Sequence, residues 1–155
     1  MEGFRMRQPA RIIAVILFSA LAATSCTISY KLKARNWGKE IEKAVKLVQE
    51  VGSSAQADPM ATQRKEWKET YMPKLDEAKA ILTSVKFSIE AASAPGSLAD
   101  AHQNLQTGVS KLIDAITALQ DAITFANPAK AAEFEKLRQE AERALVSARK
   151  KLTGQ

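Results

Sequence analysis

The strongest constraint on the fold is a stripe of mainly apolar residues that recur in alternating steps of four and three between positions 98 and 126. The stripe consists of Leu98, His102, Leu105, Val109, Leu112, Ile116, Leu119, Ile123 and Ala126. This spacing follows the turns of an α-helix and places every member on one face, as in the packed seam between two helices. One helix cannot bury such a face alone, so the pattern predicts that a second helix packs against it.

Turn and capping residues mark the start of this helix. Residues 93–96, Ser-Ala-Pro-Gly, are typical of a turn. Ser97 is predicted to cap the helix, and Asp100 lies in the first turn, where a negative charge is favourable.

A second stripe precedes that turn and indicates an antiparallel neighbour. It consists of Tyr71, Leu75, Ala78, Leu82, Val85, Ile89 and Ala92. Asp58 followed by Pro59 predicts a helix start near residue 59, which brings Trp67 into the same helix. Pro73 has no backbone N–H and clashes with the preceding turn, so we expect a kink or a break between residues 69 and 73.

Two further amphipathic segments flank this pair. The first is expected from about Asn36 to Val51, followed by a loop over residues 52–57. Its inward side chains should be Trp37, Ile41, Ala44, Val45, Val48 and Val51. The last should begin after Asn127 and end with basic residues 149–151 and Gly154. Its inward side chains should be Phe134, Leu137, Ala141, Ala144, Leu145, Ala148 and Leu152.

These four segments predict an all-α fold, an antiparallel up-down-up-down helical bundle of about four helices. The bundle should form one domain over residues 36–153. The alternative is a long three-helix arrangement in which the first segment stays loose as a stalk. The chain holds a single cysteine, so no internal disulfide bond can form and packed helices must supply the stability.

Residues 1–25 have the order of a secretory signal peptide. Three basic residues, Arg5, Arg7 and Arg11, precede the apolar run over residues 12–23, after which the side chains become small and polar. A membrane span needs about 20 apolar residues, and this run is shorter. Basic residues also follow the run at Lys31, so the flanking charges favour neither orientation.

The segment Leu21-Ala22-Ala23-Thr24-Ser25-Cys26 resembles the lipobox of bacterial lipoproteins. The resemblance implies cleavage between Ser25 and Cys26 and attachment of acyl chains such as palmitate to Cys26. It also implies a lipid-anchored protein of the bacterial cell envelope, at the outer membrane and facing the periplasm, because Thr27 is not the aspartate that favours inner-membrane retention. The alternatives are an ordinary secretory cleavage site and an uncleaved anchor.

Residues 26–35 are then expected to form a lipidated cysteine and a basic tether. Lys31, Lys33 and Arg35 lie within a few residues of the anchor, where they could contact an anionic membrane surface. The alternative is a simple solvated tether.

The sequence contains little catalytic equipment. The whole chain has one His and one Cys, and it has no Glu-x-x-His pair, no Cys-x-x-Cys-His sequence and no Gly-rich phosphate loop. We therefore predict no cofactor, no metal site and no enzyme activity. His102 lies within the apolar stripe and is predicted to be a packing or interface residue. Trp37, Trp67 and Tyr71 are predicted to pack in the core or at its boundary rather than to form a binding patch.

The charges do not favour nucleic acid. Removal of residues 1–25 takes away three Arg and one Glu and lowers the net charge from +6 to +4. Basic and acidic residues alternate along most of the remaining chain, which is typical of solvated helix faces.

The predicted function follows from the predicted location in the cell envelope and from the lack of catalytic motifs in the sequence. We expect a lipid-anchored helical bundle that acts as a binding or scaffolding module for another envelope protein. The alternative is a periplasmic ligand-sensing or cargo-binding bundle, with a pocket between helices near His102, Trp67 and Tyr71.

Overall fold

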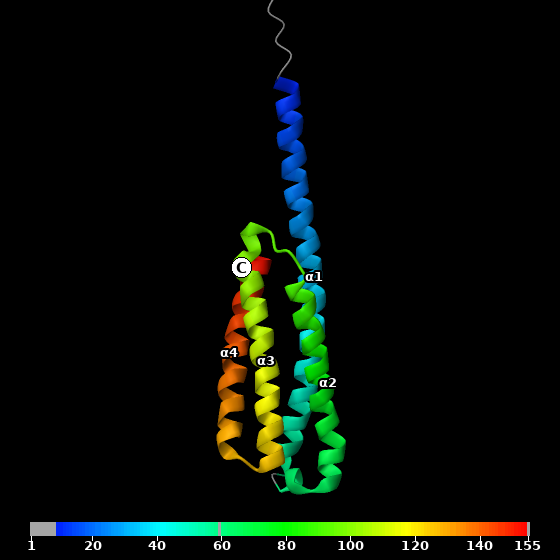
Figure 1. Cartoon of the computed structure of the whole chain (residues 1–155), viewed down its shortest axis with the longest axis vertical. Helices are drawn as coiled ribbons and strands as arrows, with labels where there is room; N and C mark the ends of the chain where they lie inside the picture. The colour runs from blue at the N-terminus through cyan, green and yellow to red at the C-terminus, as the bar shows by residue number, and fades with distance from the viewer. Residues whose placement is uncertain (1–8, 59, 155) are drawn as a thin grey trace, which may run out of the picture.

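The computed structural model describes residues 9–58 and 60–154, with the backbone alone for residues 9–24. Its helices are α1 (Pro9–Ala57), α2 (Lys65–Glu90), α3 (Ala99–Phe125) and α4 (Pro128–Thr153), with the short 3₁₀ helices η1 (Ala61–Gln63) and η2 (Gly96–Leu98). The four α-helices run alternately up and down, and α1 extends beyond the others at its N-terminal end (Figure 1). The predicted all-α, up-down-up-down bundle is therefore confirmed.

The first helix is much longer than predicted. Instead of beginning near Asn36, α1 is continuous through residues 26–35, so this segment is a helix and not a loose tether. Tyr30 and Ala34 are buried, with 3% and 6% of their surface exposed, and they continue the apolar face of Trp37 by two turns. The predicted loop over residues 52–57 is also helical.

The start of α2 was placed six residues too early. Asp58 caps the chain as predicted, since its Oδ1 accepts hydrogen bonds from the backbone N–H groups of Met60 (3.1 Å) and Ala61 (3.2 Å). These bonds support η1, however, and α2 begins only at Lys65. The helix continues through Pro73 without the predicted break. Pro73 is exposed, so the carbonyl group that loses its N–H partner can bind water.

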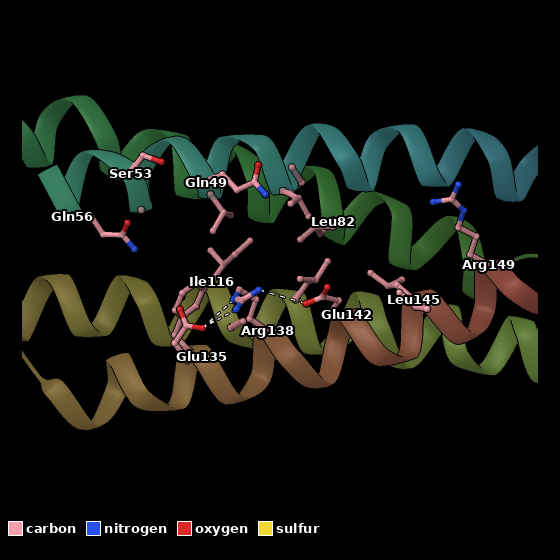
Figure 2. A pocket seen from close by; sticks show the side chains of 18 residues that line it. Gln49, Ser53, Gln56, Leu82, Ile116, Glu135, Arg138, Glu142, Leu145 and Arg149 are labelled. Atoms are coloured by element: carbon pink, nitrogen blue, oxygen red, sulfur yellow. Dashed lines mark hydrogen bonds and ion pairs between the residues drawn. The ribbon is translucent and has the colours of Figure 1, made fainter.

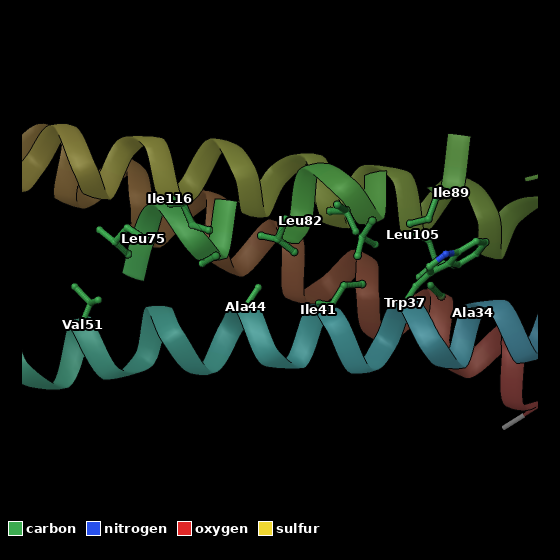
Figure 3. Packing of buried hydrophobic residues seen from close by; sticks show 14 of the residues in the cluster. Ala34, Trp37, Ile41, Ala44, Val51, Leu75, Leu82, Ile89, Leu105 and Ile116 are labelled. Carbon is green, nitrogen blue, oxygen red and sulfur yellow. The ribbon is translucent and has the colours of Figure 1, made fainter. Parts of the chain in front are cut away.

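The core lies where α1, α2 and α3 meet. Its most deeply buried large side chains are Val51, Leu75, Leu82, Ile89, Val109 and Ile116 (Figure 3). Both tryptophans belong to this core, as predicted, and each indole spans the α1–α2 interface. Trp37 Nε1 donates to Ser88 Oγ (2.9 Å), and Trp67 Nε1 donates to Ser54 Oγ (2.8 Å).

Small residues hold α4 close to α3. Ala101, Gly108 and Ala115 are buried at intervals of seven on α3, and Ala141 and Ala148 are buried at the same interval on α4. A Cβ atom added to Gly108 would lie only 2.6 Å from Leu145 Cγ. The two backbones can therefore approach more closely than larger side chains would allow.

The capping predictions for α4 are confirmed, and the one for α3 is wrong. Asn127 Oδ1 accepts a hydrogen bond from the Ala129 N–H (3.0 Å), and Gly154 ends α4 in the left-handed conformation (φ 75°). At the start of α3, Leu98 rather than Ser97 occupies the capping position, and no side chain caps the helix. The preceding 3₁₀ turn η2 moves the helix start past Ser97.

Candidate functional site

A groove opens along the seam between α1 and α4. The helices pack in chain order, α1 on α2, α2 on α3 and α3 on α4, and α3–α4 is the most extensive interface. Among the described residues, α1 and α4 form no comparable interface. The space between them is a groove of about 760 Å³ (Figure 2).

The floor and walls of the groove are mostly apolar. The apolar lining residues are Ala44, Val45, Val48, Leu82, Leu112, Ala115, Ile116, Phe134, Leu145 and Val146. Several of them, including Val48, Leu112 and Leu145, are only partly buried, and Val146 is 47% exposed. The groove therefore presents apolar surface that the bundle itself leaves uncovered, which is typical of interaction sites.

The groove is elongated along the helix axes. On α1 it extends from Ala44 to Gln56, and on α4 from Phe134 to Arg149. At 1.5 Å per residue these stretches are about 18 Å and about 22 Å long. This shape matches about three to four turns of an additional helix.

The two rims of the groove differ in charge. The α1 rim carries the uncharged Gln49, Ser53 and Gln56. On the α4 rim, Arg138 lies between two carboxylates, with its guanidinium 3.0 Å from Glu135 Oε2 and 3.6 Å from Glu142 Oε2 (Figure 2). These pairs are exposed and add little stability, so they remain available to exchange partners.

The groove exists because α4 is drawn toward α3. The buried face of α4 is built on Ala141 and Ala148, which allow a close approach to α3 but do not reach α1. The larger α4 side chains Phe134, Leu145 and Val146 then line the groove instead of closing it. The apolar pattern of α4 predicts that Phe134 and Leu145 face inward, but it does not predict this opening. The alanine spacing on α4 is the signal that could have revealed it.

The predicted lipid attachment site lies on the surface of α1. Cys26 is an exposed free cysteine, and Ser25 beside it is also exposed. The basic start of the signal peptide and the side chains of its apolar run and of lipobox positions 21–24 lie outside the described residues. Within the described part of the chain, no helix combines the length and apolar character needed to cross a membrane.

The three basic residues that follow Cys26 are all exposed on α1. Ile28, Lys31, Leu32 and Arg35 share one helix face, and Lys33 lies outside it. Ile28 and Leu32 are 61% and 58% exposed. The opposite face of the same turns is buried through Tyr30 and Ala34.

His102 takes part in a contact between α1 and α3. Its Nδ1 lies 2.8 Å from Tyr30 Oη, and its Nε2 lies 3.1 Å from the amide nitrogen of Gln106. Tyr30 also packs edge-on against Trp37, with 5.7 Å between the ring centroids. Burial raises the pKa of the Tyr30 hydroxyl, which therefore stays neutral. This geometry agrees with the predicted packing role of His102.

The pocket suggested for His102, Trp67 and Tyr71 is not formed. Trp67 and Tyr71 stack on each other, 4.8 Å between centroids, near the start of α2. His102 is near the start of α3, at the opposite end of the bundle, because α2 and α3 are antiparallel (Figure 1). None of the three lines the groove. That prediction requires the three residues to lie close together. The opposite directions of α2 and α3 place His102 at the other end of the bundle from Trp67 and Tyr71.

Among the described residues, no cluster of His, Cys, Asp or Glu side chains could hold a metal ion. Every buried side-chain nitrogen or oxygen atom in the described part of the chain has a hydrogen-bond partner.

No family model matches the chain, and no curated protein or solved structure is significantly similar to it.

Proposed function

We propose that this protein is a bacterial cell-envelope lipoprotein whose helical bundle binds another envelope protein. Acyl chains on Cys26 anchor it to the membrane, and the groove between α1 and α4 receives an amphipathic helix of the partner. The sequence around Ser25 and Cys26 supports the anchor, and Cys26 is exposed. The single observation that carries the binding role is the uncovered apolar groove.

The composition of the groove defines the partner helix. Its inward face should carry apolar residues at i, i+3, i+4 and i+7 to cover Val48 and Leu145. One flank should carry polar side chains for Gln49 and Ser53 on the α1 rim, and the other should carry charges that pair with Glu142 or Arg149 on the α4 rim. A fifth helix of this type would complete the bundle.

The alternative, a ligand-sensing or cargo-binding bundle, has weaker support. A small polar ligand needs converging polar groups inside a concave site. The polar side chains of this groove lie on its rims, and its floor is apolar.

Site-specific photocrosslinking in the native host tests the binding role. A crosslinking amino acid is placed at Gln49 or Val146 on the groove, and at Gln139, an exposed α4 position that does not line it. We expect both groove positions to crosslink to one helical segment of an envelope protein, mapped by mass spectrometry, and Gln139 not to.

A charged side chain in the groove should abolish that crosslink. Val146→Arg is suited to this because Val146 is already 47% exposed, so folding should tolerate the change. Gln139→Arg is the matched control, with the same charge on the outer face of α4. Crosslinks from Gln49 that persist in Val146→Arg, or that lead only to lipid or to a second copy of the chain, would contradict the proposed partner.

The anchor is tested separately by intact mass analysis of the membrane fraction. We expect the wild type to lack residues 1–25 and to carry acyl mass, and Cys26→Ala to lose both changes. A wild-type chain that keeps residues 1–25 and carries no acyl mass would exclude the lipoprotein assignment.

A further inference from the structure

We propose that the end of the bundle beside Cys26 is a basic platform that rests directly on anionic phospholipid headgroups. This inference rests on the proposed lipid anchor and adds how the domain is oriented on the membrane. The platform comprises residues 25–35 of α1, residues 91–100 around η2, and residues 149–154 of α4.

Two contacts place these segments at one level of the bundle. Tyr30 of α1 meets His102 of α3 at 2.8 Å. Two residues nearer the start of α3, Asp100 accepts a hydrogen bond from Lys151 Nζ of α4 (2.7 Å). Figure 1 shows the end of α4 beside the α2–α3 connection, on the side toward which α1 extends. The last turn of α4 therefore lies near the level of Tyr30.

Because α1 is continuous, no flexible segment separates the proposed anchor at Cys26 from the bundle. Tyr30, which is 3% exposed, follows Cys26 by four residues, about 6 Å along the helix axis. The headgroup layer is itself about 5–7 Å thick. Acyl chains on Cys26 would therefore bring the end of the bundle into contact with the headgroups.

The net positive charge of the domain is concentrated at this end. The platform carries six basic side chains and one acidic side chain, Asp100, which is already paired with Lys151. The basic residues are Lys31, Lys33, Arg35, Arg149, Lys150 and Lys151, and all six are exposed. The platform thus has a net charge of +5, whereas residues 26–155 together have +4. The rest of the domain is close to neutral, so only this end is attracted to an anionic surface.

Exposed apolar residues at the same place also suit a lipid interface. Ile28 and Leu32 are largely exposed and alternate with Lys31 and Arg35 on one face of α1. Apolar side chains mixed with basic ones are typical of helices that lie at headgroup level. A platform contacting lipid through both α1 and α4 would hold the bundle upright. The α1 side of the groove, which begins at Ala44, would then lie about 27 Å along α1 from Cys26, whereas its α4 side reaches the platform at Arg149.

The test uses the full-length gene product purified from membranes and reconstituted into vesicles. A fluorophore is attached at Thr153→Cys on the platform or at Thr124→Cys at the opposite end of the bundle, since acylated Cys26 does not react. Nitroxide-labelled headgroups quench the fluorophore on contact. One set of vesicles is phosphatidylcholine alone, and the other contains 30% phosphatidylglycerol.

We expect strong quenching at residue 153 with phosphatidylglycerol, and little quenching at residue 124 on either vesicle. Salt at 1 M should weaken the quenching, because at this ionic strength the attraction between charges is screened beyond about 3 Å. Each basic residue next to an anionic membrane contributes roughly fivefold to such an equilibrium. The double variant Arg149→Glu, Lys150→Glu should therefore lower the equilibrium constant for contact with the headgroups by roughly 25-fold or more.

The matched control is Lys136→Glu, Arg143→Glu, which makes the same charge change at exposed positions of α4 away from the platform. This variant should retain the quenching at residue 153. If the fluorophore at residue 153 of an acylated chain were quenched equally on both kinds of vesicle, the proposed platform would be wrong. The proposed function would not be affected. A chain without acyl mass would overturn the proposed function.

Discussion

Among single residues, Gly108 has the clearest structural role. Gly108 lies between Leu105 and Val109 of the α3 stripe, and no local sequence pattern indicates a role for it. Its importance comes from α4, because an added Cβ would lie 2.6 Å from Leu145 Cγ and 3.3 Å from the Ala141 carbonyl oxygen. Leu145 could move toward the groove, but the backbone oxygen of Ala141 could not move without shifting α4.

Gly108→Ala should therefore destabilise the protein, although alanine is normally the better helix former. We expect a loss of about 1–3 kcal/mol from overpacking. The matched control is Gly38→Ala on α1, where an added Cβ meets nothing within 4 Å. That variant should gain about 0.5–1 kcal/mol. Urea denaturation followed by circular dichroism measures both. Equal stabilisation by the two substitutions would mean that α3 and α4 are not in close contact.

Between elements, polar pairs supplement the apolar α3–α4 interface. Lys111 Nζ lies 2.7 Å from Glu140 Oε2, and Lys151 Nζ lies 2.7 Å from Asp100 Oδ2. Hydrogen bonds from these lysines lower the pKa values of the Glu140 and Asp100 carboxyl groups. Both pairs are solvent-exposed, so their contribution is small and salt-dependent.

The lowered pKa values determine how the stability changes with pH. A carboxyl group with a lowered folded-state pKa stabilises the protein above its unfolded pKa, and this contribution is lost as the pH falls through the folded value. The double variant Asp100→Asn, Glu140→Gln should be slightly less stable than wild type at pH 7, with the difference shrinking as the pH falls below about 4, the ordinary pKa of these carboxyl groups. Thermal melts over this range measure the effect.

The control for this pH series is Glu40→Gln, an exposed α1 residue for which the structure describes no ion pair. We expect it to change the melting temperature little at pH 7. A difference between the double variant and wild type that grows as the pH falls would contradict the assigned role of the two pairs.

The sequence predicts the existence of each helix more accurately than the residue at which that helix begins. The stripe on α3 and the Asn127 cap of α4 are local patterns, and both are confirmed, except that the last member of the stripe, Ala126, is exposed and ends the helix in the left-handed conformation. The predicted start of α1 near Asn36 is wrong, because the basic residues before it belong to a packed helix and not to a solvated segment. Tyr30, Ala34 and Trp37 in fact share one face, and packing against α2 and α3 selects the helix.

For the whole molecule, the turns of α1 that follow Cys26 are part of the folded core. Tyr30→Ala should remove a buried ring and its contact with His102, and it should cost about 3–5 kcal/mol. Lys31→Ala, one residue away and exposed, should change the free energy of unfolding by less than about 0.5 kcal/mol. If both variants were as stable as wild type, residues 26–35 would be a tether after all.

The sequence alone determined that this chain forms an antiparallel helical bundle, because apolar periodicity and helix caps are properties of neighbouring residues. The proposed export and lipidation signal also rests on the sequence alone, because such a signal is a linear motif. Only the tertiary structure decided that the packed part of α1 begins near Cys26, that His102 and Trp67 lie at opposite ends, and that α4 leaves a groove beside α1. These features depend on how closely backbones approach, and that distance is set jointly by side chains such as Gly108 and Leu145 that are far apart in the sequence.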